Sequence, residues 1–136
     1  MQEADIQAHV LALAAAHISK GIYRGNATLD QAPMIVNCFT FVQWLWREAG
    51  VIVPAHMLAW NEALSVERKA MQPCDLVFTP RLNRTLDTDD FGHIGIVERD
   101  GWIIHASRLC GSIGADPSTQ FFERGCLGVR RVPLPR

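Results

Sequence analysis

The chain has 136 residues, with 13 Lys and Arg side chains against 14 Asp and Glu side chains. This length suits one domain with one hydrophobic core over residues 1–136. The balanced charge offers no basic stripe of the kind that binds nucleic acid, and no apolar run reaches the roughly 18 residues of a membrane span. We therefore expect neither nucleic acid nor a membrane as a partner.

The first predicted element is an amphipathic helix over residues 5–19. Its inward-facing side chains are Ile6, Val10, Leu13 and Ile18. The apolar run over residues 10–16 is similar to the core of a signal peptide, but acidic side chains precede it where a signal peptide carries positive charge. We therefore expect a cytoplasmic protein. Export by a non-standard route, or a role in a phage or as an effector, fits the same observation.

The stretch from Asn37 to Gly50 predicts a central helix with defined ends. Asn37 is a good N-cap, Gly50 stands where helices end in the left-handed conformation, and most of the surface between them is apolar. Cys38 takes the first helical position, where the macrodipole and backbone N–H groups lower the pKa of a thiol and can hold a developing oxyanion. These are the needs of a cysteine nucleophile. The alternative is a buried thiol that packs as a small apolar side chain.

The remaining elements alternate short apolar runs with turn-forming residues. A glycine-bounded loop over residues 21–26 holds Tyr23, the only tyrosine, and an irregular segment over 27–36 leads to the central helix. Residues 55–70 predict a further helix, after which the pattern changes to strands. The strands are predicted over 76–78, 93–98, 102–106 and 127–132, with a polar loop over 80–90, a tight turn over 99–101 and turn-rich chain over 109–118. Helices followed by an antiparallel meander indicate an α+β fold.

The four cysteines are Cys38, Cys74, Cys110 and Cys126. None belongs to a C-x-x-C pair, and their spacing fits no zinc pattern, so no metal site is expected. Reduced thiols are the default inside a cell. A bridge among Cys74, Cys110 and Cys126 stays open for a protein that works outside it.

His93 and His105 lie in two predicted strands that flank one tight turn, twelve positions apart. A two-residue turn would put the two side chains on opposite faces of the hairpin. A three-residue loop over 99–101, or a bulge at Gly95, would put them on one face. The three-residue loop requires a left-handed glycine at its third position, and Gly101 is there. We predict both histidines on one face, turned toward the start of the Cys38 helix; the alternative for His105 is a structural histidine.

Four segments in this order resemble the NlpC family of papain-like cysteine peptidases, which cleave amide bonds in bacterial cell-wall peptides. The segments are residues 37–42, 75–78, 93–97 and 104–106, and the resemblance covers roughly residues 21–132. The family's usual pattern is Asp-Cys-Ser-Gly at the helix start, then Gly-Asp-Leu-Val-Phe, His-Val-Gly-Ile and Ile-His-Ala strands.

The resemblance implies a papain-like α+β fold in which the helix that carries the cysteine packs on an antiparallel sheet. It implies Cys38 as the nucleophile, His93 as the base and His105 as the polar residue that orients His93. Tyr23 matches a tyrosine that lines the site, and with Asn37 it is expected to contact the oxyanion or the substrate. The implied partner is a peptide or a peptidoglycan fragment, no cofactor is implied, and the oligomeric state stays open.

Several positions depart from the family's pattern. Asn37 replaces an aspartate, which removes a negative charge beside the thiol. Phe39 and Thr40 replace serine and glycine, Cys74 stands where glycine is usual, and the proline before Tyr23 is missing. The catalytic set is intact, but the substrate is left open. Hydrolysis of another amide, or acyl or amide transfer, are alternatives.

A hypothesis of another class is a non-catalytic binding module on the same scaffold. Such a module would keep the cleft and use Arg81, Arg84 or Arg108 to hold an acidic ligand, whereas the ordinary role of these arginines is a solvated surface. Thiol reactivity separates the two, because a catalytic Cys38 is alkylated quickly at neutral pH and a core cysteine is not. We expect the enzyme, a cysteine peptidase or amidase.

Overall fold

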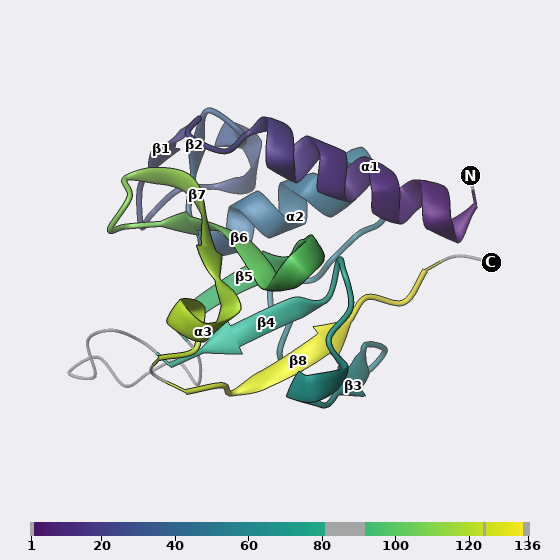
Figure 1. The fold of residues 1–136 in the computed structure, drawn as a ribbon. Coiled ribbons are helices and arrows are strands. Elements are labelled where there is room, and N and C mark those ends of the chain that lie inside the picture. Colours follow the sequence, from purple (N-terminus) through teal and green to yellow (C-terminus); the bar gives the residue numbers. More distant parts are fainter. Residues whose placement is uncertain (1, 81–91, 124, 135–136) are drawn as a thin grey trace.

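The computed structural model describes residues 2–80, 92–123 and 125–134, and it has the expected α+β architecture (Figure 1). Its helices are α1 (Glu3–Ala16), α2 (Cys38–Glu48) and α3 (Ser118–Phe121), with 3-10 turns η1 (Leu29–Gln31), η2 (Arg68–Ala70) and η3 (Arg99–Gly101). Its strands are β1 (Ile22–Tyr23), β2 (Ile35–Val36), β3 (Leu64–Val66), β4 (Leu76–Thr79), β5 (His93–Val97), β6 (Trp102–Ser107), β7 (Ser112–Pro117) and β8 (Gly128–Arg131). No helix among the described residues is long and apolar enough to cross a membrane.

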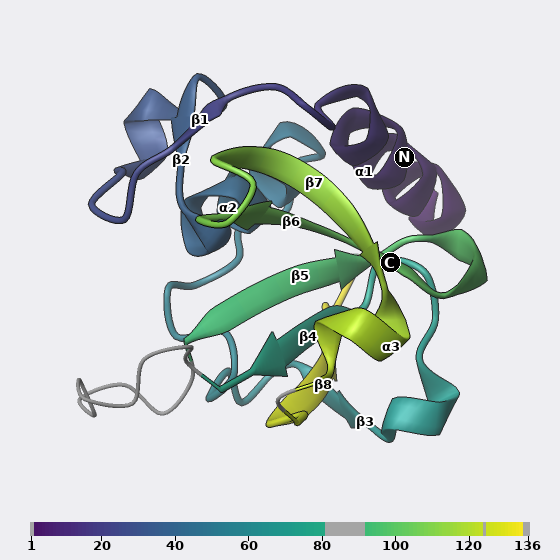
Figure 2. The same cartoon turned by 60° about the vertical axis from the view of Figure 1, so that its left-hand side comes forward.

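Six strands form the main sheet in the order β3-β8-β4-β5-β6-β7, with antiparallel neighbours throughout. Strands β4 to β6 make the expected antiparallel meander, which β7 extends, and β8 returns from the end of the chain to lie between β3 and β4 (Figure 2). Strands β1 and β2 pair in parallel as a separate ribbon beside the start of α2. The meander therefore brings residues 93–117 into one continuous part of the sheet.

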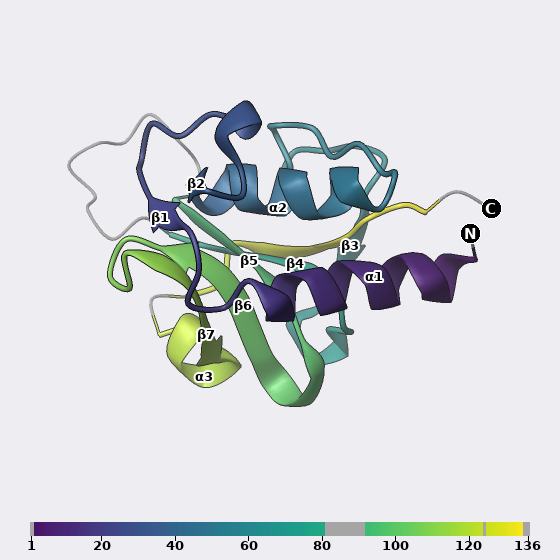
Figure 3. The same ribbon diagram turned by 90° about the horizontal axis from the view of Figure 1, so that it is seen from above.

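The two faces of the sheet are covered by different helices. Helices α1 and α2 lie side by side over one face (Figure 3), where they bury the larger apolar cluster together with Ile94, Ile96 and Ile104. The short helix α3 lies on the other face (Figure 2), where Phe121 packs with Val97 and Ile103 in a second cluster. Alternate residues of β5 and β6 thus face α2 and α3, as the two-residue period of a strand requires.

The central helix has the predicted ends. Asn37 Oδ1 accepts hydrogen bonds from the backbone N–H groups of Phe39 (3.0 Å) and Thr40 (2.8 Å), and the Thr40 hydroxyl accepts the Asn37 N–H at 2.9 Å. This is a reciprocal capping box. Gly50 follows the last turn with a φ of +87°, a conformation that glycine adopts without strain.

Two segments differ from the sequence-based expectations. The predicted helix over residues 55–70 is wrong: this chain forms turns, the edge strand β3 and η2. Met57 is buried, but Leu64, on the edge strand β3, is 59% exposed. The apolar side chains of this segment therefore do not form the single buried stripe that supports a helix. The turn-rich segment over 109–118 contains strand β7, which the pairing with β6 organises. The predicted loop over 80–90 lies, apart from its first residue, outside the described residues.

The start of β4 is fixed by a buried ion pair. Asp75 is 1% exposed and accepts hydrogen bonds from Arg131 Nε (2.8 Å), Arg131 Nη2 (2.9 Å) and the Gln72 N–H (2.8 Å). The preceding Cys74 has a φ of +79°, which explains why a glycine suits this position. Its thiol donates to the Gln7 carbonyl at 3.4 Å, and burial raises its pKa to about 12. Asp75, the first residue of the segment 75–78 that resembles the family's pattern, therefore anchors the start of β4 to Arg131.

Candidate active site

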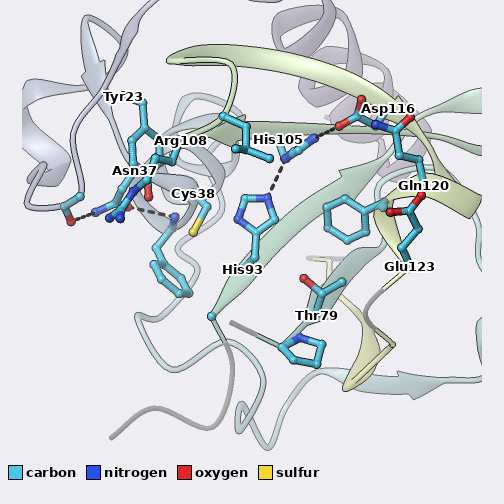
Figure 4. Close-up of a pocket in the computed structure, with 16 residues that line it drawn as sticks. Tyr23, Asn37, Cys38, Thr79, His93, His105, Arg108, Asp116, Gln120 and Glu123 are labelled. Carbon is cyan, nitrogen blue, oxygen red and sulfur yellow. Dashed lines mark hydrogen bonds and ion pairs between the residues drawn. The ribbon is translucent and has the colours of Figure 1, made fainter. Parts of the chain in front are cut away.

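A pocket of about 400 Å³ opens where the start of α2 meets β5, β6 and β7 (Figure 4). Its volume falls within the range of small-molecule sites. It is lined by all five residues that were predicted for catalysis and for the oxyanion or substrate: Tyr23, Asn37, Cys38, His93 and His105. The polar lining residues that matter below are Tyr23, Asn37, Cys38, His93, His105, Arg108 and Asp116.

Cys38 is the first residue of α2 and is 3% exposed. Figure 4 shows its sulfur atom turned toward the same opening as the His93 ring. The thiol thus stands at a helix N-terminus, where the macrodipole favours the thiolate. None of the four cysteines forms a disulfide.

The hairpin between β5 and β6 has the predicted three-residue loop. Ile96 pairs with Ile104 and Val97 with Ile103, the Glu98 N–H donates to the Trp102 carbonyl at 2.8 Å, and Gly101 has a φ of +79°. This register puts His93 and His105 on one face, which confirms the predicted loop and the shared face of the two histidines.

The two imidazole rings are joined by a hydrogen bond. His93 Nε2 lies 2.7 Å from His105 Nδ1, and the ring centroids are 4.8 Å apart at 80°. Nδ1 of His93 is the nitrogen left for a reaction partner, since Nε2 is bonded to His105.

The face that carries the histidines differs in part from the expectation. They open into the pocket that Cys38 lines, but they share the sheet face of Ile103 and Phe121, whereas the body of α2 packs on the opposite face. His93 is the first residue of β5, so its side chain lies at the end of the strand, in the pocket that Cys38 also lines. The start of α2 and the histidine pair therefore line one pocket at the edge of the sheet, although the histidines lie on the face opposite the body of α2.

Asp116 is a site residue that the sequence analysis missed. Its Oδ2 lies 2.7 Å from His105 Nε2, so a chain of hydrogen bonds runs from His93 through His105 to a carboxylate (Figure 4). Asp116 belongs to β7, which was predicted as turn-rich chain. The sequence signal that could have revealed it is Gly111, a turn-forming residue. A hairpin at this glycine returns the chain along β6 and places Asp116 near His105.

Burial controls the ionisation of the two histidines. Burial, with a smaller contribution from the His105 charge, lowers the pKa of His93 to about 3, while the Asp116 carboxylate acts in the opposite direction. Burial also lowers the pKa of His105, against the hydrogen bond and charge of Asp116. His93 is therefore a neutral imidazole at neutral pH, the form that can accept a proton.

Phe121 of α3 covers the histidine pair. Its ring centroid lies 5.5 Å from that of His93 and 5.2 Å from that of His105. Gly95 of β5 makes this cover possible, because a Cβ there would stand 2.5 Å from a methyl carbon of Ile103 and 3.1 Å from the Phe121 ring. The aromatic ring keeps water from one side of the imidazoles, which strengthens their hydrogen bonds.

Asn37 is engaged by the backbone on both sides of its amide. Oδ1 caps α2, and Nδ2 donates to the carbonyls of Gly25 and Ala27, each at 3.2 Å. Both amide hydrogens are used, since a primary amide has two. In this structure Asn37 therefore ties the loop after β1 to the helix start, and it offers no amide hydrogen to a substrate.

Tyr23 and Arg108 form the other wall of the pocket. The Arg108 guanidinium carbon lies 5.9 Å from the centroid of the Tyr23 ring. Burial, and next the charge of Cys38, raise the pKa of Tyr23, while Arg108 acts against both. Arg81 and Arg84 lie outside the described residues, so Arg108 is the arginine of the binding hypothesis that the structure places at the cleft. Within the described ranges, no three His, Cys, Asp or Glu side chains converge as metal ligands would.

A helix that begins with a cysteine and packs on an antiparallel sheet is a papain-like arrangement, and here it places Cys38 in one pocket with His93 and His105. The family model described as NlpC/P60 family matches residues 22–131, most of the chain. The chain belongs to the NlpC/P60 family. This family consists in general of cysteine hydrolases of cell-wall peptidoglycan, and it includes non-catalytic members.

Solved structures share this fold at low sequence identity. A protein of Staphylococcus aureus described as similar to a lipoprotein of the NLP/P60 family superimposes with a TM-score of 0.74 and 18% identity, over 99% of this chain and 43% of its own. The peptidoglycan hydrolase RipB of Mycobacterium tuberculosis gives 0.72 and 16%, over 98% of this chain and 70% of its own. RipD of the same organism, described as a non-catalytic peptidoglycan-binding NlpC/p60 domain, gives 0.69 and 14%, over 98% and 100%. This chain thus spans less than half of the staphylococcal protein. No curated protein matches its sequence.

Proposed function

We propose that this chain is a cysteine peptidase or amidase that hydrolyses an amide bond in cell-wall peptides. The observation that carries the proposal is the placement of Cys38, at a helix N-terminus, in one pocket with the hydrogen-bonded His93–His105 pair. Membership of a family of peptidoglycan hydrolases supports the substrate class.

In the proposed reaction, His93 takes the Cys38 proton on Nδ1 and the thiolate attacks the carbonyl carbon of the amide. The Cys38 backbone N–H and Tyr23 stabilise the oxyanion. The imidazolium of His93 then protonates the leaving amine as the C–N bond breaks, which leaves a thioester on Cys38. His93 next takes a proton from water, the hydroxide attacks the thioester, and the acid leaves as the thiol recovers its proton.

Replacement of Cys38 by alanine tests the proposal. We expect Cys38→Ala to abolish hydrolysis of defined cell-wall peptides, read by mass, while Cys110→Ala, a change at an exposed cysteine, leaves most activity. Iodoacetamide labelling of Cys38, mapped by mass because Cys110 is also accessible, should be fast at neutral pH and slower in His93→Ala. Equal hydrolysis by the parent and Cys38→Ala would end the enzyme proposal.

The binding module is the second candidate, and Arg108 favours it. Arg108 is exposed, lines the pocket and forms no ion pair with any residue in the described ranges. A pocket-lining cation of this kind suits a carboxylate. If the chain only binds, the parent should leave every peptide intact, and Cys38→Ala should bind as tightly as the parent while Arg108→Gln binds acidic peptides more weakly.

A further inference from the structure

The Asp116 carboxylate is the end of the hydrogen-bond chain, and the reaction proposed above does not use it. In the β6–β7 ladder Asp116 pairs with Ile103 and Gly114 with His105. Directly paired residues of antiparallel strands point to the same face, so Asp116 is a diagonal neighbour of His105 on the face that carries the histidines. The contact is therefore built into the register of the sheet.

We propose that Asp116 is a positioning residue that fixes the tautomers of both histidines, so that the lone pair of His93 Nδ1 faces Cys38. This inference rests on the proposed function, because it matters for catalysis only if His93 is the base. It concerns the direction in which each hydrogen bond runs, which is independent of the identity of the substrate.

The direction follows from the carboxylate outward. A carboxylate only accepts hydrogen bonds, so His105 Nε2 must carry the hydrogen in the 2.7 Å contact with Asp116 Oδ2. His105 is 5% exposed, and its lowered pKa keeps the ring neutral at neutral pH. Its Nδ1 is then a lone pair and must accept from His93 Nε2 at 2.7 Å. A neutral His93 with its hydrogen on Nε2 has its lone pair on Nδ1.

Without the carboxylate the chain can run in reverse. His105 could then carry its hydrogen on Nδ1 and donate it to His93 Nε2. The hydrogen of His93 would move to Nδ1, and this nitrogen could no longer take a proton from the thiol. The hydrogen bond between the two histidines can run in either direction with the rings in the same positions. Packing by Phe121 alone therefore does not determine its direction.

Asp116 also acts after the proton has moved. When His93 becomes an imidazolium, both of its nitrogens donate, and the existing bond to His105 Nδ1 keeps its direction. The negative charge of Asp116, which lies one ring away from His93, acts to raise the pKa of both histidines against the larger effect of their burial. One residue thus selects the reactive tautomer and stabilises the charged intermediate state.

Imidazole nitrogen NMR on the full chain tests the tautomers directly, whether or not a substrate is known. In the parent we expect His93 and His105 both to carry the hydrogen on Nε2. Asp116→Ala should introduce the other tautomer, and Asp116→Glu should restore the parent spectrum at least in part. Glu123→Ala is the matched control, because Glu123 is an exposed carboxylate that lines the same pocket and should leave both rings unchanged.

Kinetics link the tautomers to the reaction. Asp116→Ala should lower kcat on a cell-wall peptide between about 10-fold and about 10⁴-fold, the range for partners that orient a functional histidine, with KM changed little. A parent spectrum with the hydrogen of His93 on Nδ1 would overturn the inference even if Asp116→Ala failed to fold. So would unchanged tautomers or an unchanged kcat in a folded Asp116→Ala. Expected tautomers in a parent that hydrolyses no peptide would uphold the assignment of Asp116 and count only against the proposed function.

Discussion

Acidification from pH 7 to about pH 5 is expected to destabilise the fold through His93. The pKa of this ring falls from an ordinary value of 6.5 to about 3 on folding, so the folded state binds fewer protons than the unfolded state between these values. The stability contribution is therefore complete above about pH 6.5 and is lost as the pH falls toward 3. For a single group with these two pKa values, the free energy of unfolding falls by roughly 2 kcal/mol between pH 7 and pH 5. This is an upper figure, because His93 borders the pocket.

Urea unfolding at several pH values between 5 and 7 measures this loss. The window lies above the ordinary pKa of most carboxylates, so the buried histidines dominate the slope, and the lowered pKa of His105 adds to it in the same direction. His93→Gln removes one titrating ring and should reduce the loss by about 2 kcal/mol. A flat stability profile in the parent, or an equal loss in His93→Gln, would refute a buried neutral His93.

Three further predictions concern packing, the ion pair and the pocket wall. Gly95→Ala should destabilise the fold by about 1–3 kcal/mol in urea unfolding, because its Cβ overlaps a strand neighbour and the ring that covers the histidines; an unchanged midpoint would contradict this packing. Arg131→Met should cost about 3–5 kcal/mol, since it leaves the Asp75 carboxylate buried with one N–H donor, whereas a loss below about 1 kcal/mol would mean that the pair is hydrated. Arg108→Gln should raise the pKa of Tyr23, the only tyrosine, in an ultraviolet titration of the folded protein; a fall would exclude the contact between them.

The central helix and the histidine hairpin could be predicted because their signals are local. Asn37 and Gly50 mark the helix ends through capping chemistry within a few residues, and Gly101 sets the hairpin loop, from which the facing of the two histidines follows. Such features need no knowledge of the rest of the chain.

The edges of the sheet could not be predicted in the same way. Strand β7 contains two residues that are common in turns, Gly114 and Pro117, and it forms because β6 offers it a pairing partner. Strand β3 is only partly buried and depends on β8, more than 60 residues later in the chain. Because Asp116 lies on β7, missing this strand also meant missing the third member of the hydrogen-bond chain.

The position of β8 in the sheet has a consequence for the order in which the protein folds. The residues that line the pocket lie between positions 23 and 123, but the sheet is complete only when β8 enters between β3 and β4, where Leu64 pairs with Arg131. During synthesis the pocket elements leave the ribosome before the strand that closes the sheet. Until then β4 has an open edge that can pair with other chains, and the pairing of β4 with β8 is a non-local contact of the kind that forms slowly. Pairing of residues 128–131 with β4 therefore removes an edge at which the nascent chain could aggregate.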